Sequence, residues 1–257
     1  MQIDFKKYQG TGNDFIMIDG RNQTIPLLNN EQITQLCDRR FGIGADGIII
    51  LHSHPKLDFE MVYFNPDGSQ SFCGNGARCA VKFANVLNII QEKAHFLAID
   101  GEHKAELVNN QVAIKMNDIE TINKSGNSYI IDTGSPHFIT FASLAAYNIE
   151  EYGKEIRYSA PFKKDGINVN VVEELGDDSL QMMTYERGVE AETFSCGTGA
   201  TAVAIAHAYK NKKTKINTEI QVKGGVLNVQ AEMQNEHYKS IFLIGPAKEV
   251  FHGTVSI

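Results

Sequence analysis

Short apolar runs and apolar–polar alternation cover most of this chain, and they predict a protein built mainly of short β-strands. The alternation is clearest over residues 57–64, where Leu57, Phe59, Met61 and Tyr63 share one face. Clusters of turn residues separate such segments. Strands are predicted at residues 2–8, 15–18, 48–51, 57–64, 96–99, 129–132, 138–140, 167–172 and 181–185, and a hairpin at 104–116.

Helical spacing of apolar residues is much rarer. One short helix is predicted from a cap at Asn30 to Gly42, with an apolar stripe of Ile33, Leu36, Cys37 and Phe41. Another short helix is predicted near Ser143.

Two further helices follow Cys73 and Cys196. The first has Ala77, Ala80, Val81, Ala84 and Leu87 on one side. The second, over residues 200–209, is apolar nearly all round, so other elements must cover all its sides.

The two halves of the chain repeat one another. Four landmarks recur in the same order, which indicates tandem duplication. At offsets of 122 to 124 residues, Thr11-Gly12 matches Thr133-Gly134, Gly42-Ile43 matches Gly166-Ile167, Cys73 matches Cys196, and Gly101 matches Gly224. Because each half has many strands and one central helix, we expect two pseudo-symmetric lobes, each an α/β (α+β) unit with a barrel-like, mostly antiparallel sheet around its helix. The N-termini of the two helices are expected to face one cleft.

Composition narrows the class of protein. The chain has 257 residues, 42% of them hydrophobic, and a net charge of −7, which argues against a broad nucleic-acid-binding surface. No apolar stretch is long enough to predict a membrane span. The first residues lack the pattern of a secretory signal, so a cytoplasmic protein is expected.

The chain has four cysteines and no Cys-x-x-Cys pair, which favours neither a disulfide framework nor a structural metal site. Cys37 lies on an apolar stripe and Cys79 projects from a different helix face than Cys73, so both are interpreted as structural.

Cys73 and Cys196 are the candidates for chemistry. Each stands directly before a Gly-x-Gly turn and a helix-forming run. A helix N-terminus stabilises a thiolate, and its free N–H groups bind a carboxylate. If both thiols reach one carbon acid, one removes a proton and the other delivers a proton to the opposite face, so the configuration inverts.

Other readings of these cysteine turns have less support. Neither copy has the ending of a Walker loop or the Rossmann glycine spacing. A Cys–His hydrolase needs a single nucleophile and leaves the second motif unexplained. A reversible disulfide between Cys73 and Cys196 remains open as an alternative.

Three long motifs make the chain resemble the diaminopimelate epimerase family over almost its whole length. They are Gly10-Thr11-Gly12-Asn13-Asp14-Phe15; Phe64-Asn65-Pro66-Asp67-Gly68-Ser69 with Cys73-Gly74-Asn75-Gly76-Ala77-Arg78; and Tyr185-Glu186-Arg187-Gly188 with Cys196-Gly197-Thr198-Gly199-Ala200.

The resemblance implies an isomerase without cofactor or metal that interconverts LL- and meso-diaminopimelate, on the route to lysine and peptidoglycan. It implies that Cys73 and Cys196 are the base and acid pair, assisted by His137 and Glu186. The substrate contacts that it implies are Asn13, Asn65, Gly74, Asn75, Asn168, Glu186, Arg187, Gly197 and Thr198. It also implies a homodimer, and lobes of residues 1–117 plus 246–257 and of residues 118–245.

The chain departs from the family pattern at three positions. Gly47 stands where many members have glutamine, which removes a side-chain contact there. Ser135 occupies a place often held by a substrate-binding asparagine, and Phe251 one where some relatives have a tyrosine at the dimer contact.

Two competing functions remain. One is another two-cysteine racemase, of the proline or hydroxyproline type, whose compact substrate would not require Glu186 and Arg187. The other is a thiol redox sensor or small-molecule binding protein that does not exchange the α-hydrogen.

Overall fold

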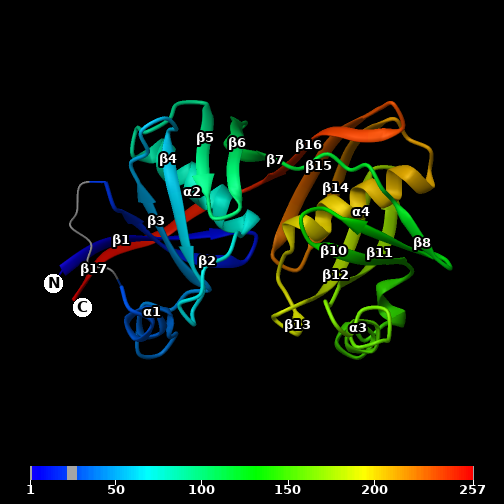
Figure 1. Cartoon of the computed structure of the whole chain (residues 1–257), viewed down its shortest axis with the longest axis horizontal. Coiled ribbons are helices and arrows are strands. Elements are labelled where there is room, and N and C mark those ends of the chain that lie inside the picture. Colours follow the sequence, from blue (N-terminus) through cyan, green and yellow to red (C-terminus); the bar gives the residue numbers. More distant parts are fainter. Residues whose placement is uncertain (1, 22–27, 257) are drawn as a thin grey trace. The chain divides into compact units, whose positions relative to one another are not determined.

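The computed structural model describes residues 2–21 and 28–256 and divides into two compact units. Unit 1 is Met1–Ile114 with Gly245–Ile257, and unit 2 is Lys115–Ile244. Figure 1 shows the strands of each unit beside one long helix. The prediction of an α/β protein with a mostly antiparallel sheet and few helices is confirmed.

Unit 1 consists mainly of strands that pair in a regular order. Counting from the strand that ends the chain, the neighbours pair antiparallel, antiparallel, parallel, antiparallel, parallel, antiparallel and antiparallel. In that order the strands are β17 (Lys248–Ser256), β1 (Gln2–Gly10), β2 (Asn13–Asp19), β3 (Gly47–His52), β4 (Phe59–Phe64), β5 (Lys93–Ala98), β6 (Gly101–Val108) and β7 (Gln111–Lys115).

Unit 2 repeats this order of pairings strand for strand. Its strands are β8 (Asn123–Ser125), β9 (Ser128–Asp132), β10 (Pro136–Phe141), β11 (Asn168–Gly176), β12 (Ser179–Glu186), β14 (Lys215–Val222), β15 (Gly225–Gln234) and β16 (His237–Gly245), with the two-residue β13 (Ala191–Glu192) beside β12. The shared order of parallel and antiparallel pairs is what a duplicated unit predicts.

Each unit has one central helix. The helix α2 (Gly74–Val86) packs on β1, β2, β3 and β4, whereas α4 (Gly197–Lys210) packs on β9, β10, β11, β14 and β15. Eleven residues of α4 are buried, from Gly197 to Ala208, as its apolar sequence requires. Most residues of the first turn are buried in both helices, which fixes the place where the two candidate cysteines stand.

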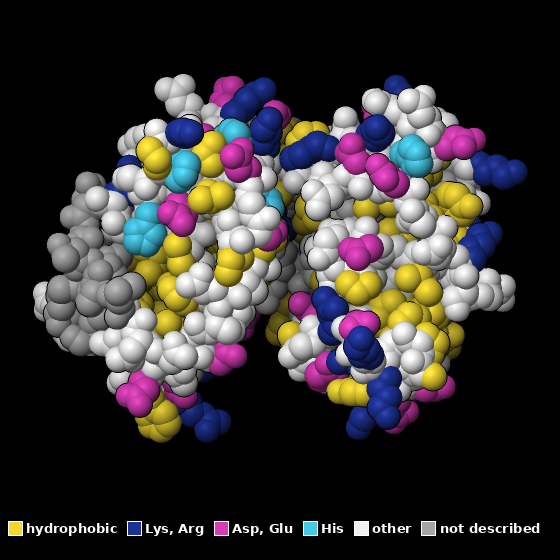
Figure 2. Space-filling view, in the orientation of Figure 1, with side chains coloured by type: hydrophobic (Ala, Val, Ile, Leu, Met, Phe, Trp, Pro, Cys, Tyr) yellow, Lys and Arg dark blue, Asp and Glu magenta, His cyan; other side chains and the backbone are white. Residues whose placement is uncertain are grey.

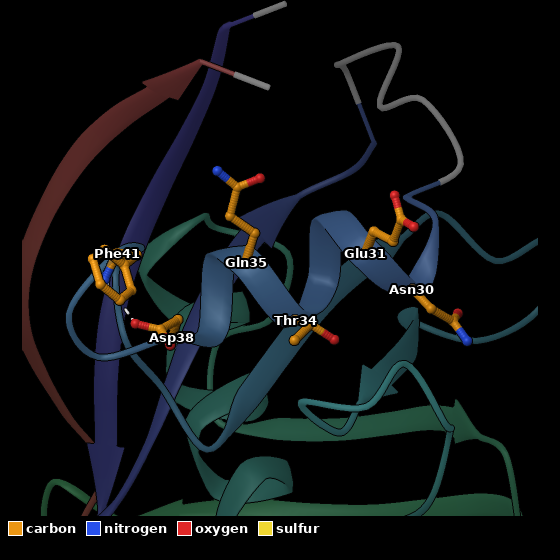
Figure 3. Close-up of a pocket in the computed structure, with 6 residues that line it drawn as sticks. All are labelled: Asn30, Glu31, Thr34, Gln35, Asp38 and Phe41. Carbon is orange, nitrogen blue, oxygen red and sulfur yellow. Dashed lines mark hydrogen bonds between the residues drawn. The ribbon is translucent and has the colours of Figure 1, made fainter.

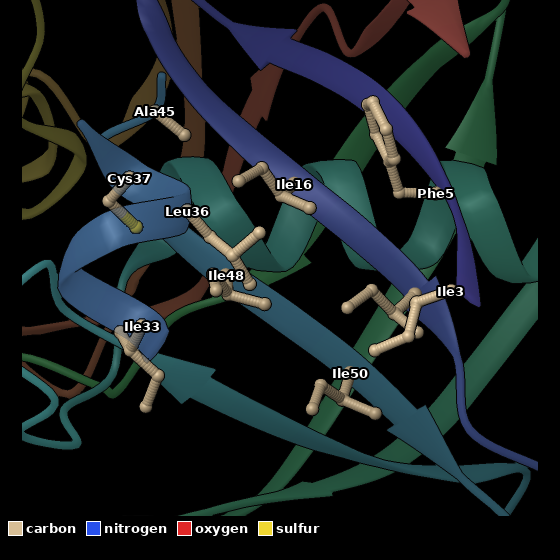
Figure 4. Close-up of a cluster of buried hydrophobic side chains, with 10 residues drawn as sticks. Ile3, Phe5, Ile16, Ile33, Leu36, Cys37, Ala45, Ile48 and Ile50 are labelled. Atoms are coloured by element: carbon tan, nitrogen blue, oxygen red, sulfur yellow. The ribbon is translucent and has the colours of Figure 1, made fainter. Parts of the chain in front are cut away.

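The smaller helices cover the outer faces of the sheets. The helix α1 (Asn30–Cys37) packs on β3, and Figure 4 shows Ile33 and Leu36 in one cluster with Ile16, Ile48 and other side chains from β1, β2 and β3. The short 3-10 helix η1 (Leu144–Ala146) precedes α3 (Ile149–Arg157), which packs on β11, β12 and β13.

The structure corrects the expected bounds of α1 and adds one helix. The cap of α1 is Asn29, whose side chain accepts a hydrogen bond from the Gln32 backbone N–H, and the helix ends at Cys37. Phe41 was wrongly placed on the buried stripe, because the chain leaves the helix before it and the ring is 84% exposed. The short helix predicted near Ser143 is η1, whose N-cap is Ser143, and the longer helix that follows, α3, is capped by Asn148 and was not predicted.

Backbone angles also adjust two of the repeat landmarks. Gly12 and Gly134 match, with φ of 94° and 97°. Gly101, with φ of 130°, matches Gly225, with φ of 142°, which opens β15 in place of Gly224. Likewise the left-handed partner of Gly166 is Gly44 and not Gly42, so residue identity alone misaligned both glycines by one or two positions.

Candidate functional site

Cys73 is the N-cap residue of α2, with extended backbone angles of −131° and 116°. The first N–H groups of a helix have no partner within the helix, so this turn offers hydrogen-bond donors beside the thiol. Cys196 has the same place in unit 2. It caps α4 with angles of −123° and 111°, so the sequence placed both cysteines correctly at the starts of the central helices.

Gly76 and Gly199 let these two helix starts approach their sheets. An added Cβ at Gly76 would lie 2.9 Å from Ile49 Cδ1, and one at Gly199 would lie 2.9 Å from Asn170 Oδ1. A larger residue at either place would push the first turn outward, and with it the cysteine. The second glycine of each Cys-Gly-x-Gly motif therefore has a packing reason.

In unit 1, Asn13 and Asn75 are joined directly. The Asn75 side-chain Nδ2 donates to Asn13 Oδ1 at 2.5 Å, and Arg78 Nη2 donates to Asn75 Oδ1 at 2.9 Å and to Thr11 Oγ1 at 2.7 Å. Arg78 is fully buried, and burial lowers the pKa of its guanidinium to about 10. The chain of bonds orients two predicted substrate contacts next to Cys73.

The other end of the Asn13 amide is held by Asp46, which accepts from Asn13 Nδ2 at 2.9 Å. Asp46 in turn accepts from Arg39, whose guanidinium also binds both carboxylate oxygens of Asp14. Lys7, itself buried, pairs with Asp14 at 2.8 Å. Asn13 is thus fixed from two sides, with one amide hydrogen still available for a ligand.

Asn65 is not joined to this network by any hydrogen bond described for the chain. Its Nδ2 donates within its own turn, to Ser69 and to Ser71 Oγ at 3.1 Å. Ser71 lies two residues before Cys73, so Asn65 supports the segment that leads to the thiol.

In unit 2, a chain of polar side chains leads from Cys196 into the sheet. Cys196 Sγ lies 3.4 Å from Thr198 Oγ1, which lies 3.0 Å from His137 Nε2. His137 is fully buried on β10, and burial followed by the charge of Arg187 lowers its pKa to about 3. The imidazole is therefore neutral at physiological pH.

Asn168, Arg187 and Ser135 form a second group in unit 2. Asn168 Nδ2 donates to Ser135 Oγ at 2.8 Å, and Asn168 Oδ1 accepts from the Arg187 backbone N–H at 2.9 Å. Arg187 Nη2 lies 3.4 Å from the same Ser135 Oγ. Ser135 thus supports the two side chains that were predicted to bind substrate.

Glu186 ends β12 directly before Arg187 and is half-buried. Burial raises the pKa of its carboxyl group above the usual value for glutamate. A carboxyl group with a raised pKa is a common feature of sites that move protons.

Gly47, which stands where many family members have glutamine, also has a packing reason to be glycine. A Cβ there would lie 2.4 Å from the Phe64 carbonyl oxygen and 2.4 Å from Tyr63 Cε2. The strands around Gly47 are therefore packed for a glycine in this chain.

Sequence reasoning missed three polar side chains that the structure joins to the predicted ones. They are Arg78, Asp46 and Asn170, the last of which lies 3.1 Å from His137 Nδ1. The apolar stripe gave no signal for Arg78, because at helical spacing this residue lies on the side of Lys82 and Asn85, and yet it is buried.

The surface outside the predicted site has a groove and a mixture of charges. A groove follows the exposed side of α1 (Figure 3) and contains no predicted site residue; it is lined by Asn30, Glu31, Thr34, Gln35, Asp38 and Phe41. On the face shown in Figure 2, Lys and Arg side chains lie among Asp and Glu side chains. Across residues 2–21 and 28–256, no group of three His, Cys, Asp or Glu side chains could hold a metal ion, and no helix is long and apolar enough to cross a membrane.

Solved structures of very different sequence share the fold over nearly the whole chain. A phenazine biosynthesis protein of the PhzF family from Bacillus anthracis is 14% identical, with a TM-score of 0.77 and full coverage of both chains. A hydroxyproline epimerase from Agrobacterium vitis is 12% identical, with a TM-score of 0.67 over 99% of this chain and 92% of its own. The fold is therefore one that PhzF-family proteins and an epimerase share.

Sequence comparison narrows that class. The family model described as diaminopimelate epimerase matches residues 5–121 and 129–250. The diaminopimelate epimerase of Flavobacterium psychrophilum is 49% identical over 97% of this chain and 98% of its own. That of Aquifex aeolicus is 36% identical over 99% and 98%. The chain belongs to the diaminopimelate epimerase family and is an isomerase.

Proposed function

We propose that the chain interconverts LL- and meso-2,6-diaminopimelate without a cofactor, with Cys73 and Cys196 as the two bases. The observation that carries the proposal is the equivalence of the two cysteines. Each caps the central helix of its own unit with nearly the same backbone angles. A reaction that inverts a carbon centre needs one proton-transfer group for each face of that carbon, and a duplicated helix start supplies two.

The proposed step conserves protons. One cysteine, as the thiolate, takes the α-proton of the amino acid and becomes a thiol, and the C–H electron pair stays on the α-carbon beside the carboxylate. The other cysteine, as the thiol, gives its proton to the opposite face and becomes the thiolate. The reverse reaction exchanges the two roles.

The remaining site residues are proposed to hold the two amino-carboxylate groups. The backbone N–H groups at the starts of α2 and α4, at Gly74-Asn75 and Gly197-Thr198, suit the carboxylate at which negative charge develops. Arg187 suits the distal carboxylate and Glu186 the distal ammonium, with Asn13, Asn65 and Asn168 as hydrogen-bonding partners. His137 and Glu186 are proposed to assist the two thiols.

The test is isotope exchange at the α-carbon. The reduced protein is incubated with LL-diaminopimelate in deuterated water, and deuterium uptake and inversion are followed together. Both are expected in the wild type. Inversion is expected to be abolished by Cys73→Ala and by Cys196→Ala.

Cys37→Ala is the matched control, because Cys37 is a buried residue of the apolar side of α1, and burial raises its pKa to about 11. This variant is expected to keep the wild-type rate. Full activity in either the Cys73 or the Cys196 variant contradicts the two-base mechanism.

A racemase acting on proline or hydroxyproline is the second candidate. The shared fold with a hydroxyproline epimerase favours it. Against it stand Glu186 and Arg187, since a compact cyclic substrate has no distal amino-carboxylate for them. Turnover of proline or hydroxyproline, with none of diaminopimelate, would replace the first proposal by the second.

A homodimer and a cytoplasmic location complete the proposal. Val250 and Phe251 of β17 are 58% and 45% exposed, and such neighbouring apolar side chains favour a contact with a second copy. Four cysteines in 257 residues are too few for the disulfide framework of a secreted domain, which favours a reducing compartment. Sedimentation of the wild type and of Phe251→Asp tests the dimer, and cell fractionation tests the location.

A further inference from the structure

The polar chain behind Cys196 continues past His137 to two residues that have no role in the proposed reaction. Asn170 Nδ2 lies 3.1 Å from His137 Nδ1 and donates to the Phe138 carbonyl oxygen at 3.2 Å. Thr184 Oγ1 donates to Asn170 Oδ1 at 2.9 Å. Asn170, His137 and Thr184 are all buried, so their hydrogen bonds compete little with water.

The orientation of the Asn170 amide follows from its neighbours. The Phe138 carbonyl oxygen only accepts hydrogen bonds, so the amide group that faces it is the NH2 group. The same nitrogen faces His137 Nδ1, and its second hydrogen points there. The oxygen of the amide then faces the Thr184 hydroxyl, which donates to it.

The amide orientation decides the tautomer of His137. Because a donor faces Nδ1, that nitrogen presents its lone pair, and the single proton of the neutral imidazole lies on Nε2. A proton on Nδ1 would point at the Asn170 N–H. Burial keeps the ring neutral, as its pKa of about 3 indicates.

The tautomer in turn directs the Thr198 hydroxyl. His137 Nε2–H donates to Thr198 Oγ1 at 3.0 Å, and the hydroxyl hydrogen is then free to point along the 3.4 Å contact to Cys196 Sγ. The Thr198 backbone is held as well, because its carbonyl oxygen accepts from Thr133 Oγ1 at 2.9 Å.

We propose that Asn170 is a positioning residue that holds His137 as the Nε2–H tautomer, so that the Thr198 hydroxyl donates to Cys196 and stabilises its thiolate. The inference rests on the proposed function, since it gives Cys196 a means to carry negative charge in that reaction. No proton passes along the chain. When Cys196 is a thiol, its own proton is not used by Thr198 and remains available for the substrate.

This relay of hydrogen bonds, from Asn170 through His137 and Thr198 to Cys196, has no counterpart at the matching strand position of unit 1. The strand pairing that sets His137 opposite Asn168 sets Phe15 opposite Gly47 in unit 1. Phenylalanine at that register position has no hydrogen bond to offer. The two thiols therefore differ in what lies behind them, although their backbones match.

The tautomer is tested first, in the wild-type protein without substrate. Nitrogen-15 NMR of histidine-labelled protein is expected to show the proton of His137 on Nε2 and an unprotonated Nδ1. In Asn170→Leu, which keeps a buried side chain but removes the donor, this preference is expected to weaken. A wild-type His137 with its proton on Nδ1 would overturn the inference.

The relay is tested with a matched pair, Thr198→Val and Thr198→Ser, read by carbon-13 NMR titration of labelled cysteine. The valine variant keeps the branched shape without the hydroxyl, and the serine variant keeps the hydroxyl. A hydrogen bond to a charged group is worth enough that valine should leave about 10- to 100-fold less thiolate on Cys196 at a given pH. The serine variant should leave the thiolate fraction of Cys196 unchanged. The titration of Cys73 in the same molecule is the internal reference.

Steady-state rates complete the test. Thr198→Val is expected to lower kcat by about 10- to 100-fold, with KM little changed because the backbone N–H groups remain. Wild-type titration and kcat in the valine variant would contradict the relay, and so would equal losses in the serine variant. If the wild type does not act on diaminopimelate, the proposed function is wrong. The two NMR measurements need no substrate, so they test the relay in either case.

Discussion

Asp14 belongs to a cluster of charged side chains that is joined by hydrogen bonds to the amide group of Asn13. Burial alone would raise the pKa of its carboxyl group, but hydrogen bonds and charges from Arg39 and Lys7 outweigh burial and lower the pKa to about 2. Through Arg39 and Asp46 this cluster holds Asn13 in place. Ion pairs thus orient the side chain of Asn13, one of the proposed substrate contacts.

Asp14→Asn is expected to lower the free energy of unfolding at pH 7 by about 1–2 kcal/mol, after allowance for solvent screening. A carboxyl group with a lowered folded-state pKa stabilises the fold above its unfolded-state pKa, here near 3.8, and this contribution disappears as the pH falls through about 2. Urea unfolding of both proteins between pH 7 and pH 2 should therefore give curves that converge in acid. A constant difference at all pH values would show that the charge of Asp14 does not stabilise the fold.

At the residue scale, the sequence predicted what lies in local motifs and missed what depends on register. Cys73 and Cys196 were found because a cysteine, two glycines and a helix-forming run are contiguous. The place of Asn170 beside His137 was not predicted. Its contact with His137 needs the parallel pairing of β10 with β11, and no local pattern specifies which strands pair.

At the scale of elements, α3 shows why small residues matter in helix packing. Gly153 faces β12, and an added Cβ there would lie 2.3 Å from Tyr185 Cβ and 2.4 Å from Tyr185 Cγ. The helix therefore lies closer to the strand than any residue with a side chain would permit. The ring of Tyr185 is held in turn by Glu190, which accepts from its hydroxyl at 3.1 Å.

Gly153→Ala is expected to lower the free energy of unfolding by about 1–3 kcal/mol, although alanine is the better helix former, because overpacking outweighs helix propensity here. Glu155→Ala in the same helix is the control, since Glu155 is exposed and should change stability by about 0.5 kcal/mol or less. Urea unfolding measures both. Stabilisation by Gly153→Ala would mean that α3 can move away from β12 without cost.

The long helices were predicted well and the short ones less well, for a physical reason. α4 is apolar on all sides and α2 has a clear apolar face, so both have strong patterns. In α3 the apolar stripe has only three residues, Ile149, Tyr152 and Ile156, and of these only Ile149 is buried. Its capping residue, Asn148, with two acidic residues in the first turn, was the stronger sign of where it begins.

For the whole molecule, the division into units predicts how fragments behave. Unit 2 is one continuous segment, Lys115–Ile244, with its own buried helix and its own apolar cluster of Phe138, Ile149, Ile167, Val169, Val171 and Tyr185. Unit 1 is completed by a distant strand, because β17 pairs with β1 from Gln2↔Ser256 to Gln9↔Lys248. That return was expected only through the family resemblance, since the apolar pattern of a strand does not name its partner.

A fragment of residues 115–244 is expected to fold by itself and to unfold cooperatively, because a domain of this size buries enough of its own surface. Circular dichroism and tyrosine fluorescence should follow one urea transition. A fragment of residues 2–114 is the contrasting case, since β1 then lacks β17 and Phe5 loses its edge contact with Phe251. Cooperative folding of this fragment, or its absence in the first, would contradict the division.

The pairing of β1 with β17 also has a consequence for biosynthesis. A ribosome releases β1 first, but the strand that completes its hydrogen bonds emerges only after the whole of unit 2. At typical elongation rates this delay is on the order of ten seconds. Unit 2 therefore finishes folding before unit 1, although its synthesis begins later. In the meantime β1 has an unpaired edge, and unpaired strand edges are sites of aggregation and of chaperone binding.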